Sequence, residues 1–262
     1  MNNTWALKPQ DCDRMPPASH LYPCVTITIV TREAPMPHKV RSLPNHIKYS
    51  LYFTAVGIFA ALLSMRESSS YGHLFEIIPV LGGTLPFFTL TVLFVTIYKL
   101  DGGDLRRLGW GWPNWNTTKA KTIGLLAAWT IGLMVLRILE SGLLAPLLDQ
   151  IGPPASSLSR MAPLIGNLEL TLALLPFMWL VVIGEELLFR GFILNFLAKK
   201  LGGTKLSWSI AIVISAALFG LGHFWQGPRG MIATGIGALI MGTAYYLAGR
   251  TLWPTIIAHA LV

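Results

Sequence analysis

Charged residues are scarce in this sequence: Asp, Glu, Lys and Arg make up only 12% of its 262 residues. A soluble domain of this length carries about 25% charged residues, so this scarcity excludes an ordinary water-soluble globule. Hydrophobic residues account for 53% of the chain, and its mean hydropathy is +0.57. At about 20 residues per membrane-spanning helix, the length allows about six to eight spans. The lipid bilayer is therefore the expected solvent and partner.

Cysteine is almost absent, since Cys12 and Cys24 are the only two. Two cysteines at these positions define no disulfide framework and no metal site. Both lie in residues 1–46, where seven prolines interrupt every potential helix, so we interpret this segment as a disordered arm. The arm lacks the basic start, apolar centre and small-residue cleavage site of a signal peptide. An alternative start at Met36 would leave only a short basic tail before the first span.

Long apolar runs follow the arm and predict an all-α, polytopic helical bundle over residues 47–262. The expected spans are Ile47–Met65, Leu74–Tyr98, Ala120–Leu139, Leu168–Leu188, Leu206–Phe224 and Met231–Leu247. A seventh run starts at Trp253 and Pro254, where proline suits the first helical turn, and it is expected to be cut short at Val262. Small residues in the sixth span, including Gly235 and Gly242, predict close helix packing.

Lysine and arginine set the expected orientation. They are concentrated before the first span, between spans two and three, between spans four and five, and before the seventh run. The alternate loops carry only Arg66, Arg160 and Arg229. This pattern predicts a cytoplasmic amino terminus. It also accounts for the net charge of +8 without a nucleic-acid partner.

An ionisable side chain within a membrane span is energetically unfavourable, so each one is expected to have a partner or a function. Arg137 and Glu140 lie within one helical turn and are expected to pair locally. Glu186 and Arg190 have the four-residue spacing of an intrahelical ion pair. Glu185 directly precedes Glu186, and neighbouring helix residues point about 100° apart, so the two carboxylates are not expected to share a partner. Glu186 is therefore expected to be structural and Glu185 free to react.

Two of the six histidines lie in apolar runs, namely His223, which shares a helix face with Phe219, and His259. At about 1.5 Å per residue, Glu185 lies about 21 Å from the cytoplasmic interface, His223 about 27 Å and His259 about 13 Å. All three depths fall within the bilayer and allow a shared polar cavity. A carboxylate and two histidines can activate water and stabilise an oxyanion. The same three ligands can also bind zinc, and the residues leave both options open.

Three motifs occur in a specific order: Glu-Glu-x-x-x-Arg at 185–190, Phe-x-x-x-His at 219–223, and a late intramembrane histidine, His259. In this order they resemble the CPBP family of intramembrane endopeptidases, also called the ABI or CAAX-protease-like family. The resemblance covers about residues 165–262. It implies a helical membrane protease.

The resemblance also implies roles for the motif residues. Glu185 would activate water together with His223, and His259 would help to stabilise the oxyanion. Supporting roles would fall to Glu186, Arg190 and Phe219. Members of the family have been described both as metalloproteases and as metal-independent glutamate-type proteases. The expected cofactor is therefore either none or zinc, held by Glu185, His223 and His259.

Substrate and location follow from the same resemblance. Eukaryotic relatives remove the last three residues of prenylated CAAX proteins, and bacterial relatives are linked to peptide or bacteriocin processing and self-immunity. The expected substrate is a peptide or a membrane-anchored, prenylated protein, and the expected location is the bacterial plasma membrane. The family's last motif continues to an Asn or similar residue four positions after the histidine. That position would be 263, and the chain ends at Val262, so half of the oxyanion arrangement is expected to be missing.

Two functions of other classes stay open. The set of Glu185, His223 and His259 would also serve as a proton or ion relay in a small transporter, although no paired repeat halves are visible. A catalytically inactive bacteriocin-immunity or scaffold protein is the second alternative, and the missing residue 263 favours it. Other protease classes fit poorly, because the chain has neither a His-Glu-x-x-His zinc pair nor a Gly-x-Ser-x-Gly nucleophile motif.

Overall fold

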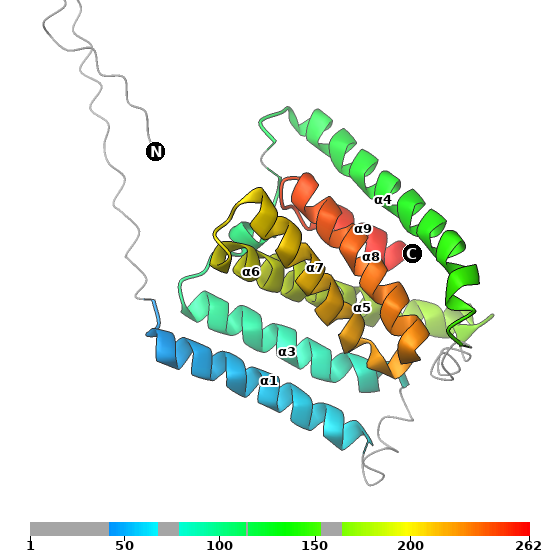
Figure 1. Cartoon of the computed structure of the whole chain (residues 1–262), viewed down its shortest axis with the longest axis horizontal. Helices are drawn as coiled ribbons and strands as arrows, with labels where there is room; N and C mark the ends of the chain where they lie inside the picture. The colour runs from blue at the N-terminus through cyan, green and yellow to red at the C-terminus, as the bar shows by residue number, and fades with distance from the viewer. Residues whose placement is uncertain (1–41, 68–78, 114, 153–163) are drawn as a thin grey trace, which may run out of the picture. The chain divides into compact units, whose positions relative to one another are not determined.

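The computed structural model describes residues 42–67, 79–113, 115–152 and 164–262. These residues form seven main helical runs and no strand, so the expected all-α bundle is confirmed (Figure 1). Most of the interpreted arm, the alternative start at Met36 and the beginning of the second expected span lie outside the described residues.

Each expected apolar run contains a helix. In chain order the helices are α1 (Asn45–Glu67), α3 (Pro79–Leu100), α4 (Lys119–Leu148), α5 (Leu168–Glu185), α6 (Asn195–Lys200), α7 (Lys205–Gly222), α8 (Gly227–Leu247) and α9 (Trp253–Leu261). A π-helix, η4 (Glu186–Leu194), joins α5 directly to α6. Two short 3-10 helices are η2 (Leu105–Leu108) and η5 (Phe224–Gln226). The fourth run is therefore longer than expected and changes its helical form in the middle.

Polar side chains begin three of the long helices. Thr118, Asn167 and Thr204 each accept a hydrogen bond from the backbone N–H three residues later, at the start of α4, α5 and α7. Such caps satisfy donors that the first helical turn leaves without a partner. Pro254 lies in the first turn of α9, as expected, where its missing N–H costs nothing.

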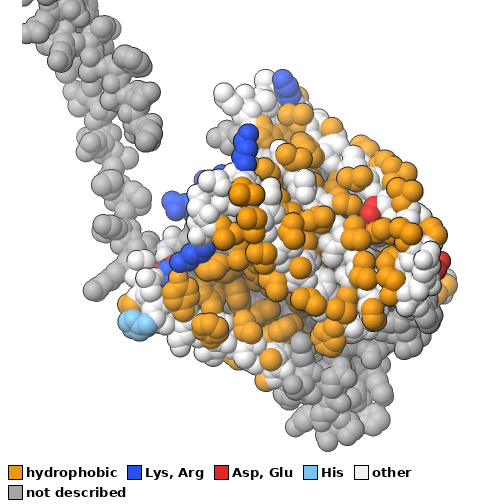
Figure 2. Space-filling view, viewed as in Figure 1, with side chains coloured by type: hydrophobic (Ala, Val, Ile, Leu, Met, Phe, Trp, Pro, Cys, Tyr) orange, Lys and Arg blue, Asp and Glu red, His pale blue; other side chains and the backbone are white. Residues whose placement is uncertain are grey.

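Four helical segments among the described residues are long and apolar enough to cross a membrane: Lys119–Leu148, Leu168–Lys200, Lys205–Gly222 and Phe224–Leu247. Hydrophobic side chains on their outer faces are exposed, and on α4 the exposed fractions of Ile131, Ile138 and Leu143 are 61%, 60% and 73%. Figure 2 shows hydrophobic side chains spread over the visible face, with Lys and Arg gathered toward its upper left. A surface of this kind is suited to lipid rather than to water.

The helices pack in neighbouring pairs. Helix α7 lies against α8, α1 lies along α3, and α4 contacts both α8 and α9 (Figure 1). Gly220 of α7 lies against the backbone of α8, because a Cβ atom there would lie 2.5 Å from the carbonyl oxygen of Met231 and 3.0 Å from the Cα of Gly235. Gly242 of α8 packs in the same way against Ile212 of α7. The predicted small-residue face of α8 is therefore confirmed.

The connection between α3 and α4 holds the start of α9. The indole N–H of Trp253 donates a hydrogen bond to the carbonyl oxygen of Gly111 (2.9 Å), and that of Trp115 donates to the carbonyl oxygen of Ala248 (3.0 Å). These contacts fix the first turn of α9 and hence the direction in which the helix carries His259.

The glycine contact between α7 and α8 gives the first prediction. In Gly220→Ala, the new Cβ atom would lie 2.5 Å from the carbonyl oxygen of Met231, so the two helices must separate. Overpacking of this kind costs about 1–3 kcal/mol. We expect a lower midpoint of thermal unfolding for the detergent-solubilised protein, measured by circular dichroism.

The matched control is Gly222→Ala in the same helix, because a Cβ atom there would have no neighbour within 4 Å. Its midpoint should stay near that of the parent. Equal midpoints for the two variants would show that the glycine contact does not hold α7 against α8.

Candidate active site

Three helical runs bring the sequence-predicted site residues together. Glu185 ends α5 and Glu186 begins η4. His223 is the C-terminal cap of α7, and His259 lies in the last turn of α9. Because Glu186 and His259 are 73 residues apart in sequence and in hydrogen-bond contact, the site depends on tertiary packing.

Glu186 is the most buried of these side chains, with an exposed fraction of 0%. Its Oε1 atom lies 3.0 Å from Nη1 of Arg190 and 2.8 Å from Nδ1 of His259. The predicted ion pair with Arg190 is therefore confirmed. An ionised carboxylate only accepts hydrogen bonds. Nδ1 of His259 therefore carries a hydrogen atom and donates a hydrogen bond to Glu186.

Glu185 lies on the other side of the His259 ring. Its Oε2 atom is 3.6 Å from Nε2 of His259, which is beyond direct hydrogen-bond length but suits a water molecule that binds both groups. The expectation that the adjacent glutamates have no common partner is wrong, since His259 contacts both. The reason is that an imidazole ring has a nitrogen on each side and fills the space between two diverging carboxylates. Among the described residues, the one ion-pair contact of Glu185 is the one with His259.

Phe219 holds the basic side chains of the site in place. Its ring is 4% exposed and lies 4.6 Å from the ring of His223 and 6.1 Å from that of His259, between centroids. The guanidinium carbon of Arg190 lies 4.8 Å from the same ring centroid, within the range of a cation–π contact. The predicted supporting residues therefore surround the two histidines.

His223 contributes one free ring nitrogen to this arrangement. Its Nδ1 atom lies 2.8 Å from the carbonyl oxygen of Phe219, one turn earlier in α7. A carbonyl oxygen only accepts, so Nδ1 carries the proton and Nε2 of the neutral ring is left as an acceptor. His223 and His259 both pack against Phe219, and Glu185 lies 3.6 Å from His259. The three side chains are therefore grouped around Phe219 and His259.

Zinc held by Glu185, His223 and His259 stays an expectation from the sequence. Within the part of the chain that the structure describes, no group of three or more His, Cys, Asp or Glu side chains is placed to hold a metal ion. The Nδ1 atoms of His223 and His259 are bonded to Phe219 and Glu186, so any metal would have to bind Nε2 of these rings. A catalytic zinc site needs three protein ligands around one point, and we derive no step through a metal.

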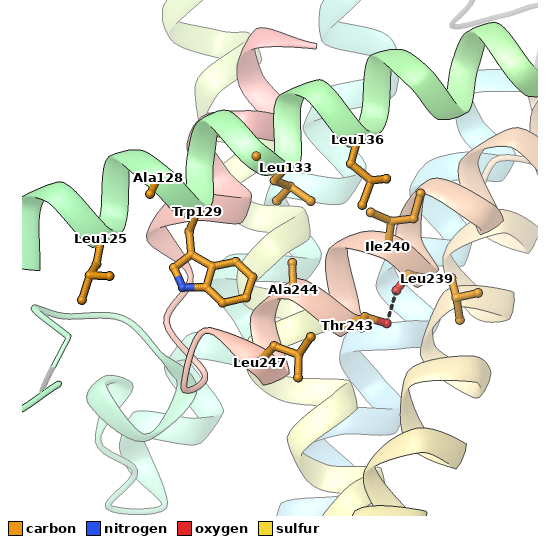
Figure 3. Close-up of a pocket in the computed structure, with 11 residues that line it drawn as sticks. Leu125, Ala128, Trp129, Leu133, Leu136, Leu239, Ile240, Thr243, Ala244 and Leu247 are labelled. Carbon is orange, nitrogen blue, oxygen red and sulfur yellow. Dashed lines mark hydrogen bonds between the residues drawn. The ribbon is translucent and has the colours of Figure 1, made fainter.

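A hollow lies between α4 and α8 and is lined mostly by apolar side chains (Figure 3). Its volume is about 540 Å³, and no charged side chain lines it. The hydroxyl of Thr243 in its wall donates to the carbonyl oxygen of Leu239 (2.8 Å), the dashed line in Figure 3. Leu133 and Ala244 in the same wall pack with Ala258, the residue before His259. The hollow is thus an apolar feature of the helix packing behind the site.

Sequence reasoning missed two buried polar residues near the motif, Asn195 and Tyr245. Asn195 is 2% exposed and Tyr245 is 0% exposed. The amide nitrogen of Asn195 donates to the hydroxyl of Tyr245 at 2.7 Å. The sequence did contain a sign of this contact. Asn195 is a single polar residue in the apolar run after Arg190, and a polar side chain buried in such a run needs a hydrogen-bond partner.

Residues 167–262 match a family model described as type II CAAX prenyl endopeptidase Rce1-like. This segment is an Rce1-like domain. The match agrees with the resemblance of the motifs to the CAAX-protease-like family, and the matched segment contains Glu185, Glu186, Arg190, Phe219, His223 and His259. No curated protein and no solved structure matches the chain. Together with the four apolar helices, the Rce1-like domain identifies an integral membrane protein and indicates peptidase activity.

The buried ion pair of the Rce1-like domain gives the second prediction. Arg190→Met leaves the charge of Glu186 buried without its cation, and the loss of one partner of a buried pair costs about 3–5 kcal/mol. We expect a strong fall in the midpoint of thermal unfolding in detergent. The exposed Lys199→Met on the same helical run, which also removes one positive charge, should leave the midpoint near that of the parent.

A double variant tests the cause. Glu186→Leu combined with Arg190→Met removes both charges, so it should be more stable than Arg190→Met alone. If the double variant is no more stable than the single one, the lost stability comes from the packing of Arg190 on Phe219 and not from the unpaired carboxylate.

Proposed function

We propose that this protein is an intramembrane endopeptidase in which Glu185 activates the water that attacks the peptide carbonyl. The observation that carries the proposal is the contrast between two adjacent carboxylates. Glu186 forms an ion pair with Arg190 and a hydrogen bond with His259. Among the described residues, Glu185 is 13% exposed and has the Nε2 side of His259 as its one basic side-chain partner within 4 Å. One glutamate is therefore fixed and the other is available as a general base.

The proposed chemistry assigns one step to each group. A water molecule bound to Glu185 and to Nε2 of His223 loses a proton to the carboxylate as its oxygen attacks the carbonyl carbon. The proton then passes to the leaving amine nitrogen, and the bond between carbon and nitrogen breaks. When Nε2 of His259 carries a proton, it can donate a hydrogen bond to the oxyanion that forms on the carbonyl oxygen.

Glu186 supports this step through His259. Its bond to Nδ1 keeps the imidazole ring in one orientation and directs Nε2 toward Glu185. Carboxylates commonly orient histidines in this way in hydrolases. Arg190 balances the charge of Glu186. The ring of Phe219 packs against both His223 and His259 and so holds the two imidazole rings in place.

The substrate class rests on the family match. The model's description names prenyl CAAX substrates, which are peptides attached to a membrane lipid chain. A site within apolar helices suits such a substrate, because its lipid chain holds the scissile bond at the membrane. We therefore propose a peptide or a prenylated, membrane-anchored protein as the substrate, and the bacterial plasma membrane as the location.

Glu185→Gln is the direct test of the proposed base. Glutamine keeps the shape of the side chain but cannot take the proton of water, so kcat should fall roughly 100- to 10,000-fold. The assay is cleavage of a farnesylated peptide ending in a CAAX sequence by the purified, detergent-solubilised protein. Products are measured by mass spectrometry.

The control is Glu169→Gln, an exposed glutamate in the first turn of the same helix. It should cleave at the rate of the parent. If Glu185→Gln is as active as the parent, Glu185 is not the base. If the parent itself does not cleave farnesylated, unmodified or other peptides, the protein is not an endopeptidase.

A further inference from the structure

A polar cluster lies beside the proposed active site and has no part in the proposed reaction. It consists of Asn195, at the start of α6, and Tyr245, near the end of α8. Both are buried, and Tyr245 packs in an apolar cluster that includes Leu194, Trp208 and Leu252. Buried polar groups lower stability unless they form hydrogen bonds, so their bonds indicate what they hold.

The bonds of Asn195 point to the end of the π-helix. Its Nδ2 atom donates to the carbonyl oxygens of Arg190 (3.0 Å) and Gly191 (2.7 Å) and to the hydroxyl oxygen of Tyr245 (2.7 Å). Tyr245 in turn donates its hydroxyl proton to the carbonyl oxygen of Leu108 in η2 (3.2 Å). This chain of bonds links η4 to α8 and to the connection before α4.

The π-helical form of η4 makes these bonds important. In a π-helix each N–H bonds to the carbonyl five residues earlier, and such segments are rare and short. The added residue in the turn rotates everything that follows it, so the directions of Arg190 and Gly191 depend on this form. The side-chain amide of Asn195 donates hydrogen bonds to carbonyl oxygens at the point where the π-helix returns to α-helix. These bonds stabilise the junction between the two helical forms.

The side-chain oxygen of Asn195 forms no such bond. Its Oδ1 atom is buried and has no hydrogen-bond partner among the described residues. A buried acceptor without a partner costs about 1–3 kcal/mol. The hydrogen bonds of Nδ2 offset this cost, and they are the contacts through which Asn195 acts on its neighbours.

We propose that Asn195 and Tyr245 are positioning residues that set the orientation of His259, an inference that rests on the proposed function. Asn195 holds the backbone of Arg190, the guanidinium of Arg190 holds Glu186, and Glu186 holds Nδ1 of His259. Tyr245 anchors the Asn195 amide from α8. Neither residue contacts the reacting atoms. Their effect reaches the reaction through the ring of His259.

Tyr245→Phe is the test, because it removes one oxygen atom and keeps the ring in its apolar cluster. The amide of Asn195 loses an acceptor and the carbonyl of Leu108 loses its donor. We expect kcat for the farnesylated peptide to fall roughly 10- to 100-fold, the usual effect of removing a group that orients an active-site histidine. KM should be unchanged. The matched control is Tyr246→Phe, whose ring stacks on Trp208 with centroids 5.1 Å apart and which should keep the parent kcat.

A second measurement does not depend on catalysis. Nuclear magnetic resonance of protein labelled at histidine ring nitrogens reports the environment of His259, with its signal assigned by loss in His259→Gln. Tyr245→Phe should shift the His259 signal, whereas Tyr246→Phe should not.

The outcomes separate the two proposals. If the parent cleaves peptide, and Tyr245→Phe keeps both the parent kcat and the parent His259 signal, the positioning role is overturned. A fall in kcat that only follows the loss of folded protein, with an unshifted His259 signal, also overturns it. If the parent cleaves no peptide, the proposed function fails, and the His259 signal alone decides whether Asn195 and Tyr245 set its orientation.

Discussion

A carboxylate with no exposed surface, that of Glu186, is the constraint on which the site depends. A charge buried among apolar helices is unstable unless it is paired and hydrogen-bonded. Arg190 from the same run and His259 from α9 provide these partners. Phe219 from α7 lies beneath the guanidinium of Arg190 and beside both histidines. Three helical runs are therefore fixed relative to one another around a single negative charge.

This arrangement explains how two adjacent glutamates have different chemistry. One uses its oxygens to hold structure, and the other faces an imidazole nitrogen at a distance that suits a bridging water molecule. Contacts farther from the site hold the helices that carry these residues in place. The contact between Gly220 and Gly235 holds α7 against α8, and Trp115 and Trp253 fix the start of α9.

Much of this structure was predictable from the sequence. Apolar runs predict the helices, and the four-residue spacing predicts the pair of Glu186 and Arg190. The contact of His259 with Glu186 was not predictable, because depth along a helix gives one coordinate and leaves rotation about the axis undetermined. The change to π-helix after Glu185 makes α-helical spacing unreliable for the residues that follow. The role of Asn195 depends on that change, and for this reason an α-helical interpretation of the run missed it.

The central claim is that Glu185 acts as a base on water and not as a nucleophile. A single-turnover reaction in water labelled with heavy oxygen, with protein in excess over the farnesylated peptide, shows whether oxygen from water enters the Glu185 carboxylate. If Glu185 activates water, the label appears in the new carboxyl group of the product, and the Glu185 carboxylate recovered by proteolysis is unlabelled. Label in the carboxylate of Glu185 with an unlabelled product would contradict the account, because the glutamate would then have attacked the peptide directly.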